Sequence, residues 1–289
     1  MHAYVDGSPL SANSARHRTG IGQIFALTFA LALTLCLAVT GVAAEKKDEK
    51  KPEPPRVLVA LPLAVEAGTN TTIRLRGLGL AEAKAIRFAT TNAAVSAALS
   101  VTLKTKSKAE VPKDYDVKRV GDTQLEVEVK LPASVAAGPL ALVVTTPEGE
   151  TAPYSLTVAP TGSLLAEKEP NGGFRQAQEL SSGKTVRGTI GEPNDVDVFR
   201  FTGQKDERIV AAVTAARQGS SLDGILTLYN SAGQILATSD DSEAGPDPLL
   251  NARLPADGRY FLSLIDAHDR GSAMHVYLLS LNRATPEKR

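Results

Sequence analysis

The sequence has one cysteine and no tryptophan among its 289 residues, and these two shortages exclude several classes of function. The cysteine, Cys36, lies inside a long apolar run near the N-terminus. The chain after this run therefore has no thiol for a disulfide, a thiolate zinc site or a cysteine nucleophile. Aromatic residues make up only 4% of the chain, which disfavours a stacking platform for sugars or nucleic-acid bases.

The chain also lacks an excess of charge of either sign. Lysine and arginine together number 32, and so do aspartate and glutamate. No net field draws such a chain to nucleic acid or to anionic lipid. We therefore expect no nucleic-acid partner, and no membrane contact except through an N-terminal segment.

Catalytic motifs are missing as well. The sequence contains no His-Glu-x-x-His motif, Walker loop, nucleophile elbow or glycine-rich dinucleotide motif after a strand. Two histidines follow the apolar run, His268 and His275, and His268 has serine and aspartate neighbours in the sequence. Catalytic triads are defined by geometry and not by nearness in sequence, so we expect a loop histidine and no enzyme.

The N-terminal segment has the pattern of an export signal. An apolar run over residues 24–43 follows Arg16 and Arg18 and ends in Val42-Ala43-Ala44. A basic region, an apolar stretch and small residues before the cut predict a signal peptide over residues 1–44, and hence a secreted, envelope or periplasmic protein. The alternative is an uncleaved membrane anchor, since about 20 apolar residues can span a bilayer. Residues 45–55 mix charges with prolines and predict an extended linker.

Residues 56–159 alternate apolar and polar side chains with a period of two. The segment Gln124–Leu131 alternates strictly, and Thr72–Arg76 and Tyr154–Val158 do so over shorter spans. Turn-forming Gly and Pro lie between these segments, which predicts an antiparallel β-sandwich. Lysines 104, 106 and 108 also alternate, either protecting an edge strand from aggregation or forming a basic stripe.

This first module resembles the immunoglobulin-like IPT/TIG domains of bacterial surface proteins. The resemblance rests on Glu66–Thr69 leading into Ile73–Gly77, on Gly138 before Leu140–Val144, and on the closing Thr146–Gly149. It implies an immunoglobulin-like fold that serves as a spacer or a protein-contact unit.

Residues 160–285 carry more specific motifs. In order, they are Glu167–Gly173, Gly188–Ile190, Asp195–Phe201, Ser221–Asp223, Leu226–Tyr229 with Gly233, Ser239–Asp241, Asp257–Tyr260 and Tyr277–Leu279. Their order and spacing resemble the bacterial pre-peptidase C-terminal domain, which is similar to the collagen-binding domain of clostridial collagenases. The resemblance implies a jelly-roll-like β-sandwich, often attached to secreted proteases and sometimes stabilised by calcium. Alternation at 209–213, 260–264 and 277–281 independently predicts strands. The fold class is therefore all-β, with two tandem antiparallel sandwiches.

Among the residues that could carry chemistry, the sharpest candidate is a calcium site. Glu167, Glu169 and Asn171 alternate in an extended segment, and we expect Asp195 and Asp197 to share one strand face. Calcium takes six to eight oxygen ligands, which such side chains supply. The resemblance implies these five residues as ligands, because the relatives hold calcium with their opening acidic motif and a following acidic loop. Gly172 stands where the relatives often have aspartate.

The same residues have a structural interpretation, in which they cap turns and accept backbone hydrogen bonds. A second acidic group is the set Asp240, Asp241, Glu243 and Asp247, for which we expect a solvated loop rather than a cation site.

These patterns favour a non-catalytic, exported binding, adhesion or structural protein that is a monomer and contacts an extracellular protein or polysaccharide. The alternatives are an accessory or targeting subunit of a secreted peptidase system, or a hydrolase with an unrecognised site. Collagen is disfavoured as a ligand, because Tyr260 and Tyr277 lie in apolar alternations that predict core packing.

Overall fold

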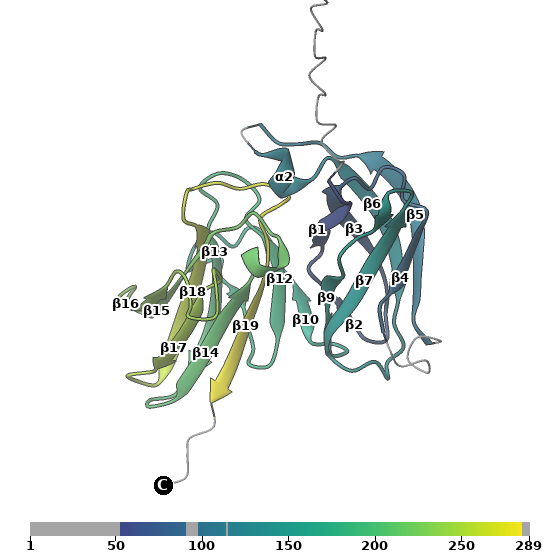
Figure 1. Cartoon of the computed structure of the whole chain (residues 1–289). Helices are drawn as coiled ribbons and strands as arrows, with labels where there is room; N and C mark the ends of the chain where they lie inside the picture. The colour runs from purple at the N-terminus through teal and green to yellow at the C-terminus, as the bar shows by residue number, and fades with distance from the viewer. Residues whose placement is uncertain (1–52, 91–97, 114, 285–289) are drawn as a thin grey trace, which may run out of the picture. The chain divides into compact units, whose positions relative to one another are not determined.

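The computed structural model describes residues 53–90, 98–113 and 115–284, and strands dominate these residues (Figure 1). The predicted signal peptide or anchor, residues 1–44, and most of the predicted linker lie outside the described residues. Within the described ranges, no helix combines the length and the apolarity that crossing a bilayer requires.

The first sandwich is built from two sheets. One has the order β1 (Arg56–Leu61), β3 (Asn70–Leu78), β6 (Thr123–Lys130) and β5 (Ser100–Lys108). The other has the order β2 (Ala64–Glu66), β9 (Tyr154–Ala159), β7 (Gly138–Thr146) and β4 (Ala85–Phe88), and the short β8 (Gly149–Glu150) also pairs with β7. A short helix, α2 (Val117–Val120), precedes β6.

The alternation in the sequence produces the core of this sandwich. Leu125, Val127 and Val129 on β6 are buried, while the polar residues between them are more exposed. They pack with Ile73 and Leu75 of β3 and with residues of β7 and β9 in one apolar cluster. The strand prediction for 124–131 is confirmed, because one face of an antiparallel sheet meets the opposite sheet while the other meets water.

The lysine-rich strand lies where edge protection predicts. Strand β5 is the last strand of its sheet, and its lysines at 104, 106 and 108 are exposed. Lys104 also forms an ion pair with Glu128 at 2.9 Å. Charged side chains on a terminal strand oppose edge-to-edge association of sheets.

The second sandwich has two five-stranded sheets. The first has the order β10 (Leu164–Ala166), β12 (Thr185–Thr189), β19 (Val276–Ala284), β14 (Arg208–Thr214) and β17 (Leu249–Arg253). The second has the order β11 (Gln178–Glu179), β13 (Asp197–Gly203), β18 (Gly258–Asp266), β15 (Gly224–Asn230) and β16 (Ile235–Ser239). A 3₁₀ turn, η1 (Ala216–Gln218), follows β14.

The long strands pair antiparallel, as the sequence predicts, but three short strands do not. Strands β2, β10 and β11 pair in parallel with β9, β12 and β13. Each has only two or three residues and lies at the end of its sheet. The sheets are therefore mixed at their edges, where pairing needs no tight hairpin connection.

The predicted alternations in the second half place their apolar members in one core. Residues 209, 211 and 213 of β14 and residues 277, 279 and 281 of β19 face residues of β13, β15 and β18 from the opposite sheet. Phe199 of β13 is fully buried there. Both sheets of this sandwich thus contribute to a single apolar interior.

Replacing Phe199 tests this core. Because its ring is fully buried, we expect Phe199→Ala to lower the free energy of unfolding of the second sandwich by about 3–5 kcal/mol. The measurement is urea denaturation followed by far-ultraviolet circular dichroism. Ile235→Ala is the control, because Ile235 is 63% exposed and should change stability by less than about 0.5 kcal/mol. Equal midpoints for the two variants would contradict the assignment of the core.

Candidate metal centre

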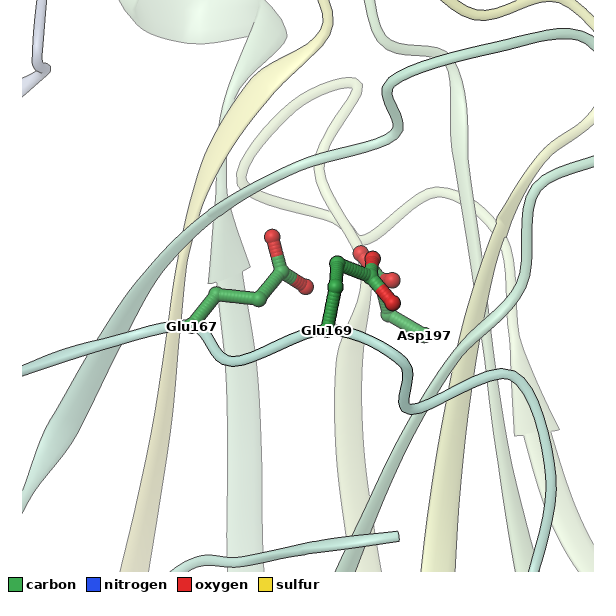
Figure 2. Close-up of side chains that lie close together, drawn as sticks. All are labelled: Glu167, Glu169 and Asp197. Atoms are coloured by element: carbon green, nitrogen blue, oxygen red, sulfur yellow. The ribbon is translucent and has the colours of Figure 1, made fainter. Parts of the chain in front are cut away.

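Three carboxylates meet at one end of the second sandwich. Figure 2 shows the side chains of Glu167, Glu169 and Asp197 grouped together. One carboxylate oxygen from each lies within 4.8 Å of the other two. The three residues come from two separate segments, so the group forms only when β13 folds against the segment that follows β10.

The strand alternation directs Asp197 into the interior. Asp197 is the first residue of β13, and it alternates with Phe199 and Phe201, which belong to the core. Its side chain is therefore fully buried. Glu167 follows β10 and runs alongside β12: its N–H donates to the Arg187 carbonyl at 3.0 Å, and its Oε2 accepts the Thr189 N–H at 2.8 Å.

Tyr277 of β19 links the two carboxylates, and the sequence analysis missed this role. Its hydroxyl lies 2.6 Å from Glu167 Oε1 and 2.7 Å from Asp197 Oδ2. The prediction that Tyr277 packs in the core is confirmed, but a buried tyrosine hydroxyl also requires a polar partner, and this requirement was the available signal. Gly188 of β12 makes room for the ring, because a Cβ there would lie 2.3 Å from the hydroxyl oxygen.

Asn171 closes the group from the loop. It is fully buried, and its Nδ2 donates to Glu167 Oε1 at 3.0 Å. Its backbone N–H donates to Glu169 Oε2 at 2.9 Å, and its carbonyl accepts the Val198 N–H at 3.1 Å. These bonds hold the loop against the start of β13.

Two oxygen atoms in this group have no hydrogen-bond partner. Asn171 Oδ1 and Asp197 Oδ1 are buried and accept no hydrogen bond from the described residues. A buried polar atom without a partner is costly, so such atoms call for a bound ion or water. Amide and carboxylate oxygens are hard ligands that suit calcium, and the residues present therefore fit this ion.

The same burial changes the protonation of the carboxylates. Burial, together with the adjacent Glu167, raises the pKa of Asp197 to about 9. Burial also raises the pKa of Glu169, and the charges of Glu167 and Asp195 add to this effect. Without a cation, the group therefore keeps a proton, because closely spaced buried carboxylates do not ionise together.

One prediction about the site residues is wrong. Asp195 and Asp197 do not share a strand face, because β13 begins only at Asp197. The chain turns just before it, with Asn194 at a φ of 65°, and Asp195 Oδ2 accepts the Gly191 N–H at 2.7 Å. Thus four of the five candidates gather directly, and Asp195 adds negative charge from the turn beside them.

The second acidic group differs from its sequence pattern. Asp240 and Asp241 form a group with Asp223, which is distant in sequence, and Asp247 does not belong to this group. Asp247 is buried, accepts the Ala216 N–H at 2.7 Å and pairs with Arg217. The Asp223 group contains no buried oxygen that lacks a partner in the described part of the chain, in contrast to the Asp197 group.

A serine, a histidine and an aspartate also lie together, but in a structural arrangement. Ser272 Oγ is 3.0 Å from His275 Nδ1, and His275 Nε2 is 3.8 Å from Asp266 Oδ2. His275 is fully buried, and Ser272 Oγ also accepts the Met274 N–H at 3.1 Å. The aspartate is too far for a hydrogen bond, and buried histidine offers no face to a substrate, so this local turn differs from a catalytic triad.

The comparisons identify the class of this sandwich. Residues 195–265 match the family model of the bacterial pre-peptidase C-terminal domain, so the second sandwich carries such a domain, which is itself non-catalytic. No comparison tests the immunoglobulin-like resemblance of the first sandwich, which stays a prediction.

Among known proteins, the chain is 41% identical over 99 residues to a probable subtilase-type serine protease of Deinococcus radiodurans. The match covers 33% of this chain and 14% of the protease, so the chain spans a small part of that relative. The pre-peptidase C-terminal domain of a Bacillus anthracis collagenase is similar at 16% identity and a TM-score of 0.32, over 40% of this chain and all of that one. The secreted serine protease VesC of Vibrio cholerae is similar at 9% identity and a TM-score of 0.29, over 76% of this chain and 48% of that one.

The raised pKa of Asp197 predicts a pH-dependent stability in chelator. The pKa of Asp197 in the folded protein, about 9, exceeds the ordinary value of 3.8, so the folded state binds the proton of Asp197 more tightly than the unfolded chain does. The stability that this proton contributes is fully present below about pH 4 and is lost as pH rises through about 9. We expect the melting temperature of the second sandwich to fall between about pH 5 and pH 9 in chelator. The measurement is calorimetry across this range.

Asp197→Asn is the matched variant, because its amide keeps the shape of the neutral carboxyl group and does not titrate. We expect this variant to show a clearly smaller fall across the same pH range. An identical pH dependence in the two proteins would contradict the assignment to Asp197.

Proposed function

We propose that this protein is an exported, non-catalytic binding protein whose second sandwich holds a calcium ion and contacts an extracellular protein or polysaccharide. The observation that carries the metal proposal is the pair of buried oxygens without partners, Asn171 Oδ1 and Asp197 Oδ1, beside two further carboxylates. A cation at this place satisfies both oxygens and removes the need for a shared proton.

Each proposed ligand has a distinct position. Asn171 and Asp197 are fully buried, Glu167 is half-buried, and Glu169 is exposed on the loop. Asp195 contributes charge from the adjacent turn. Calcium bound here would supply a fixed positive charge between the loop after β10 and β13, and these residues would hold that charge.

The substitution of Gly172 for the aspartate common in relatives leaves this site with fewer carboxylates. Affinity for calcium depends on the number of charged ligands, so we propose a single weak ion, with a Kd in the extracellular range of about 10⁻⁴–10⁻³ M. A site of this affinity fills where calcium is plentiful, outside the cytoplasm.

The position of Gly172 provides a gain-of-function test. A Cβ there would lie 3.5 Å from the Val196 carbonyl oxygen, an ordinary contact distance, so a side chain is tolerated. We expect Gly172→Asp to bind calcium more tightly, on the order of tenfold for about 1.4 kcal/mol. Isothermal titration calorimetry measures this change. Gly172→Asn is the control for size, and an equal affinity of the two variants would contradict a gain through charge.

The main test of the metal proposal is thermal unfolding with about 10 mM calcium and again with chelator. A ligand that binds only the folded state at ten times its Kd adds about 1.4 kcal/mol, which raises the melting temperature of a domain this size by several degrees. We expect Glu167→Gln with Asp197→Asn to abolish the rise. Asp240→Asn with Asp241→Asn is the matched control and should keep it. If only the Asp240→Asn, Asp241→Asn variant lost the rise in melting temperature, the ion would be assigned to the group of Asp240 and Asp241.

A second candidate function is an accessory or targeting subunit of a secreted peptidase system. The match to the Deinococcus radiodurans protease favours it, because the matched piece is only 14% of that protein. Under this proposal the chain contacts a separate peptidase and contributes no catalytic group. Co-purification with a secreted peptidase would support it, whereas hydrolysis by the purified chain that Ser272→Ala abolishes would overturn the non-catalytic proposal.

A further inference from the structure

Strand β16 is an open edge of the second sandwich. It ends its sheet, next to β15, and no other described strand pairs with its outer side (Figure 1). An open edge presents backbone N–H and C=O groups that have no partner in the sheet. Ile235 at its start is 63% exposed, and Leu236 beside it is 36% exposed.

This edge differs from the other sheet-terminal strands of the described chain. Strands β2, β4, β10 and β11 have four residues or fewer. The longer terminal strands carry charge: Arg56 on β1, three lysines on β5 and Arg253 on β17. Strand β16, with the sequence Ile-Leu-Ala-Thr-Ser, has five residues, no charge and no proline. Apart from a register shift at its start, it lacks the usual protection against strand addition, so this edge is open to pairing with another extended segment.

Apolar side chains extend the edge on both sides. A register shift places Ile235 opposite Tyr229 of β15, so the two side chains share the outer face of the sheet. The ring of Phe174 packs against Tyr229 there, with centroids 5.3 Å apart. On the neighbouring strand β17, Leu249 is 47% exposed, and its N–H donates to Ser239 Oγ at 3.1 Å. A strand added to β16 would thus find apolar contacts for side chains on either of its faces.

The unpaired backbone groups of β16 determine which kind of partner can bind this edge. A row of free backbone groups is matched by another polypeptide in the extended conformation, which repeats its donors and acceptors with the same spacing. Asp240 and Asp241 follow β16 directly, and Asp223 lies within reach of both. This acidic end complements a basic side chain on the incoming strand.

We infer that β16 docks an extended polypeptide segment with alternating apolar side chains and a lysine or arginine beside Asp240 and Asp241. The inference rests on the proposed binding role of the second sandwich and names its partner as a protein. It does not depend on the calcium site proposed above, because neither the residues of β16 nor Asp240 and Asp241 belong to the group of Glu167, Glu169 and Asp197.

The probe is a fluorescent synthetic peptide of alternating valine and threonine with lysine at both ends, and the readout is fluorescence anisotropy with the full chain. We expect saturable binding, weakened at least tenfold by Ile235→Lys, which gives β16 the kind of charge that β5 carries. Val117→Lys is the matched control: Val117 is 38% exposed on α2, and its replacement should leave binding unchanged. Melting temperatures of both variants should equal that of the parent.

Two further arms separate the backbone from the charge. Methylation of alternate backbone nitrogens of the peptide should abolish binding, since it removes the donors of the ladder. Asp240→Asn with Asp241→Asn should weaken binding of the lysine peptide and leave unchanged the binding of a peptide with neutral ends.

Three results would overturn the inference. They are no binding by the parent chain, equal binding by Ile235→Lys, or a dimer in sedimentation that Ile235→Lys dissociates, since a second copy would then occupy the edge. The metal proposal is tested separately, and it fails if calcium leaves the melting temperature unchanged. Peptide binding that persists in chelator supports the inference whichever way the calcium test falls.

Discussion

The hydroxyl group of Tyr277 lies between two carboxylates, Glu167 and Asp197, and the end of the second sandwich is organised around this contact. Tyr277 comes from one sheet and Asp197 from the other, so the contact joins the two layers across the core. Gly188 must lack a side chain for the ring to reach this place. Asn171 then adds its amide, and the loop after β10 is held against β13.

This arrangement has an electrostatic consequence. A carboxylate in the interior of a sandwich is costly when it is charged, and a second one beside it raises the cost. Either a proton or a cation must offset it, and the two partnerless oxygens, Asn171 Oδ1 and Asp197 Oδ1, favour the cation. The proposed cation would couple the folding of the loop to the ions of the medium.

The rest of the described surface follows one pattern, in which strand edges are short or charged except at β16. The pre-peptidase C-terminal domain identified at residues 195–265 includes this edge and the start of β13. Asp197 of the candidate metal group lies on β13 and the open edge is β16, two different strands of one sheet, and no residue belongs to both features. One is proposed to stabilise the domain, and the other to contact its partner.

Much of the fold could be predicted because it depends on local patterns. Alternation at 124–131, 209–213, 260–264 and 277–281 predicted long strands and their buried faces. In a sheet with one face in solvent, apolar and polar residues alternate along each strand. The candidate metal residues were also accessible, because Glu167, Glu169 and Asn171 alternate in one short segment. Parallel pairing of the short strands was not predictable, because two or three residues carry no pairing signal.

The sequence by itself determined the all-β class, the absence of a thiol after the apolar N-terminal run and the set of acidic residues that lie near one another along the chain. Tertiary structure alone decided which of these meet. It brought Tyr277 to the carboxylates, turned Asp195 away to the Gly191 N–H and placed Asp223 beside Asp240 and Asp241. It also left the outer edge of β16 without a paired strand among the described residues. The physical reason is that alternation specifies the face on which a side chain lies, whereas the partner across the core depends on the packing of strands distant in sequence.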